Sequence, residues 1–110
     1  EQLALSQEMV YGDLENFEIT GADKEKGAFF SPILFRNDKP FENQDVHNIE
    51  AFGPVSTLLP YKTIDEAITI ANLGKGSLVA SIVTNNDATA REFVLGSASH
   101  HGRILILNNE

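Results

Sequence analysis

The sequence predicts an α/β protein built on a parallel sheet, and two observations in its second half carry this prediction. Short apolar strands alternate with helices whose apolar residues recur at helical spacing. A strand–helix–strand connection, moreover, joins parallel strands by a right-handed crossover in nearly all cases. The predicted elements are a strand over 55–61, a helix over 64–73, a strand over 77–84, a helix over 88–98 and a strand over 103–107. We therefore expect a βαβαβ core over residues 50–110, preceded by an irregular segment over residues 1–49.

The first half of the sequence has weaker periodicity. Residues 3–10 are typical of the last turns of a helix that ends at the turn residue Gly12. Residues 29–35 are apolar but are interrupted by Pro32, which cannot donate to a ladder of hydrogen bonds. We therefore expect an edge strand or a bulged strand there, and one helical turn after Pro40.

The first helix of the second half has clear start and stop signals. Thr63 and Glu66 form the T-x-x-E capping box that satisfies free N–H groups at a helix start. Gly74 stands where a glycine commonly ends a helix. The residues expected on the buried face are Ile64, Ala67, Ile68 and Ala71.

The second helix follows the same logic. Asp87 is the predicted N-cap, because its carboxylate can accept hydrogen bonds from the first turn. The expected buried stripe consists of Ala90, Phe93, Val94 and Ala98.

The apolar strands on either side of this helix are nearly continuous, which is typical of strands buried on both faces of a sheet. Two helices can barely cover such a sheet. We therefore expect the chain either to form a homo-oligomer or to be part of a larger protein, since it also opens on Glu1 in what looks like mid-helix.

Composition excludes several classes of function. The chain has 110 residues and a net charge of −8, so it repels the phosphates of nucleic acids. It contains no cysteine, which excludes disulfides, thiolate metal sites and thiol nucleophiles within it. Its apolar runs are too short to cross a bilayer, and no signal peptide opens it. We expect a cytoplasmic protein that binds neither nucleic acid nor membrane.

The most informative run is Glu-Ala-Phe-Gly-Pro-Val at residues 50–55. Taken alone, it is a turn that leads into a strand, with an aromatic anchor and a solvated charge. Its context is more specific, because a strand, the helix start Asp65-Glu66-Ala67-Ile68, Asn72 and a second strand follow in order. In order and spacing, residues 29–108 resemble the aldehyde dehydrogenase superfamily, which implies that the chain is the C-terminal part of an aldehyde dehydrogenase catalytic domain.

The resemblance implies a role for each residue of the motif. In the family the glutamate hydrogen-bonds the hydroxyls of the nicotinamide ribose, and the phenylalanine packs near the nicotinamide ring. These roles fall on Glu50 and Phe52, and Gly53 and Pro54 would shape the turn that aims both side chains. A carboxylate accepts two hydroxyl hydrogens, and an aromatic face shields a ring that accepts hydride. The resemblance thus implies NAD or NADP as cofactor and an aldehyde as substrate.

Further runs indicate a subfamily. Residues 47–58, Gly-Ser-Leu-Val-Ala-Ser at 76–81 and His-Gly-Arg at 101–103 are most similar to the aldehyde dehydrogenase half of bifunctional ring-opening enzymes of bacterial phenylacetate degradation. These enzymes oxidise a CoA-bound semialdehyde.

One departure from the family matters most. The family's reaction needs a cysteine nucleophile, which this chain lacks. We therefore expect the chain alone to be inactive and to hold no cofactor.

Other candidates have simpler explanations. Gly-Lys-Gly-Ser at 74–77 hints at a phosphate loop, but it follows a helix and is better explained as a helix-to-strand turn. Adjacent histidines such as His100 and His101 tend to point to opposite sides, so a metal cluster with His47 is disfavoured.

Two alternatives stay open. In open α/β sheets, ligands usually bind beyond the carboxyl ends of the strands, which points to residues 84–87 or Asn108 rather than to Glu50. The chain could also be a self-contained small α/β interaction or regulatory domain without catalysis.

Overall fold

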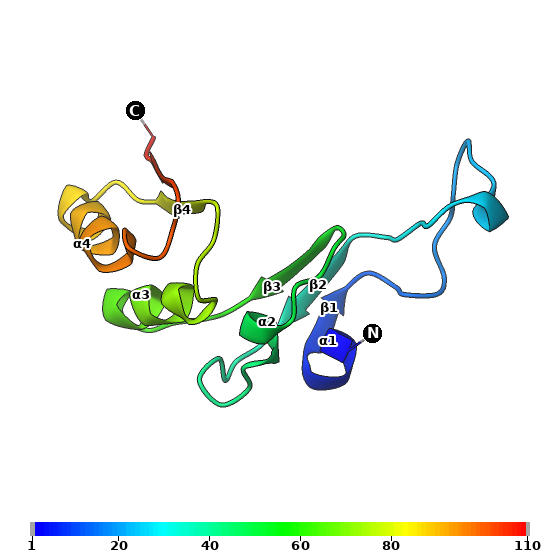
Figure 1. Cartoon of the computed structure of the whole chain (residues 1–110), viewed down its shortest axis with the longest axis horizontal. Coiled ribbons are helices and arrows are strands. Elements are labelled where there is room, and N and C mark those ends of the chain that lie inside the picture. Colours follow the sequence, from blue (N-terminus) through cyan, green and yellow to red (C-terminus); the bar gives the residue numbers. More distant parts are fainter. Residues whose placement is uncertain (1, 110) are drawn as a thin grey trace. The chain divides into compact units, whose positions relative to one another are not determined.

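The computed structural model describes residues 2–109 and has an α/β fold with parallel strand pairs, as the sequence predicts (Figure 1). Its contacts group into two compact units, Glu1–Pro60 and Tyr61–Glu110. Each unit contains a sheet of its own.

The sheet of the first unit has the order β1-β2-β3, formed by β1 (Glu8–Tyr11), β2 (Ile33–Arg36) and β3 (Val55–Leu58) (Figure 1). β2 and β3 are parallel, with Ile33 opposite Val55, whereas β1 runs antiparallel to β2. The expectation of an edge strand at β2 is wrong, because β2 lies in the centre. Pro32 lies just before the strand, so its missing N–H breaks no ladder hydrogen bond. The register irregularity falls on β1, between Met9 and Tyr11.

The N-terminal helix is shorter than predicted. α1 (Gln2–Ser6) ends early, and the chain continues as β1, since pairing with β2 satisfies the backbone of residues 8–11. Gly12 follows with φ +99°, and a side chain there would come within 2.4 Å of the Pro32 carbonyl oxygen. Glycine is therefore required where β1 leaves the sheet. The core of this unit consists of Leu3, Ile33 and Phe35, with Ala4, Leu14, Ile49 and Val55 packed against it.

Two short helices complete the first unit. η1 (Lys24–Lys26) is a 3₁₀ turn capped by the Asp23 carboxylate, which accepts a hydrogen bond from the Glu25 N–H at 3.0 Å. α2 (Asp45–Asn48) is the helical turn predicted after Pro40. Residues 1–49 thus contain β1 and β2 as well as loops.

The second unit is a β–α–β arrangement with an extra helix before it. α3 (Ile64–Leu73) precedes β4 (Ala80–Val83), and α4 (Asp87–Ser97) connects β4 to the parallel strand β5 (Ile104–Leu107) (Figure 1). The Asn72 side-chain amide of α3 donates to the Gly96 carbonyl of α4 at 3.0 Å. A Cβ at Gly96 would lie 2.8 Å from Ile68, so the glycine permits close packing of the two helices.

The helix ends differ in detail from the sequence prediction. Thr63 caps α3 as predicted, accepting from the Glu66 N–H at 3.2 Å, while the Glu66 carboxylate reaches the Lys62 N–H at 2.7 Å. Gly74 follows α3 but has φ −69°, and Lys75 takes the left-handed conformation instead, with φ 61°.

The N-cap of α4 is Asn86, and Asp87, predicted as the cap, is the first helical residue. The Asn86 side-chain oxygen accepts from the Thr89 N–H at 3.1 Å. Ala90 and Phe93 are buried as predicted, and Val94 is half-buried, but Ala98 is exposed and Ser97 is fully buried in its place.

The predicted order of strand, helix, strand, helix and strand is present from β3 to β5, and each unit contributes its own parallel strand pair. β3 pairs with β2, where the Ile33 N–H donates to the Pro54 carbonyl at 2.9 Å, and β4 pairs with β5. The two compact units divide after Pro60, so β3 belongs to the first unit. None of the described helices is long and apolar enough to cross a membrane.

One face of the β4–β5 pair is uncovered within the second unit. Ser81, Val83, Leu105 and Leu107 alternate onto this face. Val83 is 77% exposed, Leu105 and Leu107 are 46% and 44% exposed, and Ile106 on the opposite face is 50% exposed. The apolar strands are therefore not buried on both faces by the residues that the structure describes.

Candidate functional site

The motif at residues 50–55 lies in the first unit, between the end of α2 and the start of β3. Glu50 and Phe52 are both exposed, and 93% of Phe52 is accessible. A large aromatic side chain that is so exposed contributes little to the core. The core of this unit therefore does not account for Phe52.

Backbone geometry holds the motif in place. Gly53 has φ +152°, in a region that only glycine adopts readily. The carbonyl of the next residue, Pro54, accepts a hydrogen bond from the Ile33 N–H at 2.9 Å, and the Val55 N–H donates to the Gly53 carbonyl at 2.8 Å. This turn and the parallel pairing of β2 with β3 fix the segment that carries Glu50 and Phe52.

Beside the motif is a cavity of about 500 Å³. Its walls come from α1, the loops before β2 and β3, and the strands: Gln2, Leu3, Leu14, Phe30, Phe35, Ile49, Glu50, Ala51, Phe52 and Val55. Glu50 is the one charged residue in this lining. The volume lies in the range of small-molecule sites, and mostly apolar walls with few polar groups are typical of them.

The chemistry of this lining fits a flat ring attached to a hydroxyl-bearing group. In the part of the chain that the structure describes, no hydrogen bond or ion pair occupies the Glu50 carboxylate. Its two oxygens are thus available to accept hydroxyl hydrogens. The exposed ring of Phe52 offers an apolar surface beside them.

Sequence reasoning found part of this lining. The structure brings Glu50 and Phe52 to one cavity, while Gly53 and Pro54 form the adjoining turn and do not line it. Phe30 and Leu14 were missed, because they lie far from the motif in sequence. No local signal distinguished Phe30, which lies in the apolar run that was expected to form a strand.

Leu14 is positioned by a turn around Asp13. The Asp13 carboxylate accepts hydrogen bonds from the backbone N–H groups of Asn16 at 2.9 Å and Glu15 at 2.8 Å. Both bonds stabilise the charged carboxylate and lower the pKa of Asp13, and the bond from Asn16 has the larger effect. The Ser31 hydroxyl, in turn, donates to the Asp13 carbonyl at 2.6 Å and ties this turn to the segment before β2.

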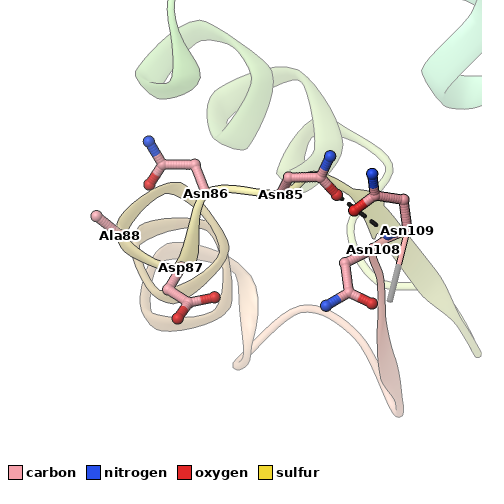
Figure 2. Close-up of a pocket in the computed structure, with 6 residues that line it drawn as sticks. All are labelled: Asn85, Asn86, Asp87, Ala88, Asn108 and Asn109. Atoms are coloured by element: carbon pink, nitrogen blue, oxygen red, sulfur yellow. Dashed lines mark hydrogen bonds between the residues drawn. The ribbon is translucent and has the colours of Figure 1, made fainter.

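A second hollow, of about 430 Å³, lies at the carboxyl ends of β4 and β5, where the general rule for α/β sheets expects ligands (Figure 2). It is lined by Asn85, Asn86, Asp87, Ala88, Asn108 and Asn109. The Asn85 side-chain oxygen accepts from the Asn109 backbone N–H at 3.1 Å (Figure 2), and the Asn86 oxygen caps α4. These two amides thus have local structural roles.

The remaining candidates have local partners. His101 lies 2.7 Å from the Ser77 hydroxyl through Nδ1, and His47 lies 3.2 Å from the Pro40 carbonyl through Nε2. Residues 2–109 contain no group of three His, Cys, Asp or Glu side chains that could hold a metal. Residues 74–77 form the predicted helix-to-strand turn.

Comparison with known proteins gives a consistent result. The model of the aldehyde dehydrogenase family matches residues 7–106. The chain is 54% identical over 82 residues to Protein MaoC from Klebsiella aerogenes, which covers 74% of this chain and 24% of that protein. It is 41% identical over 101 residues to 3,4-dehydroadipyl-CoA semialdehyde dehydrogenase from Aromatoleum evansii, covering 92% of this chain and 20% of that protein.

A solved structure gives the same result. The crystal structure of an NAD-dependent aldehyde dehydrogenase from Sinorhizobium meliloti superposes with a TM-score of 0.69 at 30% identity. The similarity covers 94% of this chain and 18% of that one. The chain therefore spans about a fifth to a quarter of the length of the proteins it resembles.

Proposed function

Because the chain belongs to the aldehyde dehydrogenase family, we propose that it is the part of an NAD(P)-dependent aldehyde dehydrogenase that holds the nicotinamide end of the cofactor. One observation carries this proposal: Glu50 and Phe52 line one cavity, beside a turn that requires glycine. The bound cofactor would supply the hydride acceptor. The family match speaks against the alternative of a self-contained interaction or regulatory domain.

Each residue of the motif has a defined task in this proposal. The Glu50 carboxylate would hold the nicotinamide ribose by accepting its hydroxyl hydrogens. The exposed ring of Phe52 would pack beside the nicotinamide and shield it from water. Gly53 and Pro54 hold the turn from which both side chains project.

The cysteine nucleophile would come from elsewhere in the longer protein, since this chain contains no cysteine. The chain alone should therefore oxidise no aldehyde. It should also bind NAD or NADP weakly, because one ribose contact cannot offset the entropy lost on association. Turnover that scales with the concentration of the purified chain, or micromolar cofactor affinity by calorimetry, would contradict these statements.

For the substrate, we propose a CoA-linked semialdehyde, formed during bacterial phenylacetate degradation by a bifunctional ring-opening enzyme. The relative from Aromatoleum evansii supports the class, because its name specifies a CoA semialdehyde and the similarity covers 92% of this chain. The longer protein should oxidise a CoA-linked semialdehyde with a higher kcat/KM than the free short-chain aldehyde. Equal values for the two substrates would exclude the CoA-linked class.

We also propose that the protein is a homo-oligomer. The apolar side chains Val83, Leu105 and Leu107 are exposed on one face of the β4–β5 pair, and exposed apolar surface of this kind favours association.

The experiment that tests the proposed function is Glu50→Gln in the longer protein. The amide keeps one acceptor oxygen but loses the charge. A hydrogen bond to a charged group contributes about 1.5–3 kcal/mol, which corresponds to a decrease of about 10- to 100-fold in turnover. Glu18→Gln is the matched control, because Glu18 is an exposed carboxylate of the same unit outside the cavity. Unchanged kinetics in Glu50→Gln would remove Glu50 from the cofactor site.

A further inference from the structure

The cavity beside the motif has an aromatic wall that the motif does not supply. Phe30 lies in the segment before β2, and 44% of it is exposed. It lines the cavity together with Glu50 and Phe52. A large apolar side chain left accessible inside a cavity gains little from the fold and has a surface free for a ligand.

Contacts across the sheet place this ring next to the motif turn. The Ile33 N–H donates to the Pro54 carbonyl at 2.9 Å, which brings the segment before β2 alongside the segment before β3. A Cβ built on Gly53 would lie 3.8 Å from a ring atom of Phe30. The Phe30 ring is therefore close to the backbone that follows Phe52, and its place is fixed by the pairing of β2 with β3.

We propose that Phe30 is a second aromatic binding residue for the nicotinamide ring, and that it acts together with Phe52. This inference rests on the proposed function. A flat, electron-poor ring between apolar walls is held best by aromatic faces, because they combine a large contact area with a favourable quadrupole. Phe30 sets how tightly the ring is held, whereas Glu50 sets its orientation through the ribose.

Neighbouring aromatic residues supply a control. Phe41 is 46% exposed, slightly more than Phe30, but it does not line the cavity. Phe41→Ala therefore removes an equally accessible ring of the same unit without changing the proposed site.

The test is equilibrium titration of the longer protein with NAD and with ADP, which lacks the nicotinamide and its ribose. Phe30→Ala and Phe30→Leu should weaken NAD binding by about two- to tenfold, the size of one aromatic contact, and leave ADP binding unchanged. Phe30→Tyr retains the ring and should bind NAD like the wild type. Phe41→Ala should change neither affinity. If the alanine variant does not fold, the Leu and Tyr variants decide.

The outcomes separate this inference from the function on which it rests. Wild-type NAD affinity in Phe30→Leu, combined with a loss in Glu50→Ala, would overturn the role of Phe30 and leave the proposed function intact. Equal losses for NAD and ADP in the Phe30 variants would assign Phe30 to packing of the fold and would also overturn the inference. Unchanged NAD binding in Glu50→Ala would overturn the proposed function itself.

Discussion

Replacing Gly53 with alanine tests how the motif turn is held. Gly53 has φ +152°, a conformation that costs a residue with a side chain about 1–3 kcal/mol. The added methyl group would meet only the Phe30 ring, at an ordinary contact distance of 3.8 Å. Steric repulsion therefore adds little, and the predicted loss of stability is the backbone cost alone, about 1–3 kcal/mol.

Two other glycines provide controls for this prediction. Gly74 has φ −69°, and a methyl group added there would meet no atom within 4 Å, so Gly74→Ala should stabilise the chain by about 0.4–1 kcal/mol. Gly21 has φ +75° in open space outside the cavity, so Gly21→Ala should cost stability without affecting the cofactor.

The assays are urea denaturation of the chain followed by circular dichroism, and NAD titration of the longer protein. Gly53→Ala should lower both stability and NAD affinity, whereas Gly21→Ala should lower stability alone. A Gly53→Ala variant as stable as the wild type would refute the argument from backbone conformation.

Three further predictions concern the rest of the chain. Asn86→Ala should destabilise the chain by about 1 kcal/mol at any salt concentration, because it removes the N-cap of α4. Asp87→Ala should cost less, and its cost should shrink in high salt, because Asp87 interacts with the helix dipole. Urea denaturation at two salt concentrations distinguishes the two variants, and equal salt dependence would contradict Asn86 as the cap. The backbone N–H of Asn16 lowers the pKa of Asp13, so the charged Asp13 stabilises the fold above the unfolded pKa of about 3.9 and loses this effect as the pH falls through the lower folded pKa. The stability difference between the wild type and Asp13→Ala should therefore decrease in acid, and a difference independent of pH would disprove this role of Asp13. The chain should associate at tens of micromolar in sedimentation, and Leu105→Glu should weaken the association; a single monomeric species of the wild type would show that the uncovered face of β4–β5 is not an interface.

The elements that could be predicted from the sequence are those whose signals are local. α3 has the predicted bounds, because an apolar stripe and the cap Thr63 both lie within or next to its own residues. The predicted cap of α4 lies one residue late, since Asn86 and Asp87 are both good caps and only the extended backbone of Asn86 decides between them.

The elements that could not be predicted depend on distant partners. β1 forms because residues 8–11 pair with β2, and the sequence of these residues does not predict that pairing. The same holds for the parallel pairing of β3 with β2, which no residue within either strand specifies. Strand pairing is a non-local property, and propensity alone does not fix it.

The candidate site also combines residues that a local motif predicts with a residue that depends on strand pairing. Glu50 and Phe52 were found from one contiguous motif and its family resemblance. Phe30 was not found, because it is distant from the motif in sequence and reaches the cavity only through the parallel pairing of β2 with β3.

The central claim, that Glu50 binds the nicotinamide ribose, is tested most directly by comparing NAD with ADP as ligands of the longer protein and its Glu50→Ala variant. ADP lacks the group that the carboxylate would hold. The variant should bind NAD about tenfold or more weakly than the wild type, the value of a charge-assisted hydrogen bond, and should bind ADP with wild-type affinity. An equal loss for both ligands, or no loss for NAD, would contradict it.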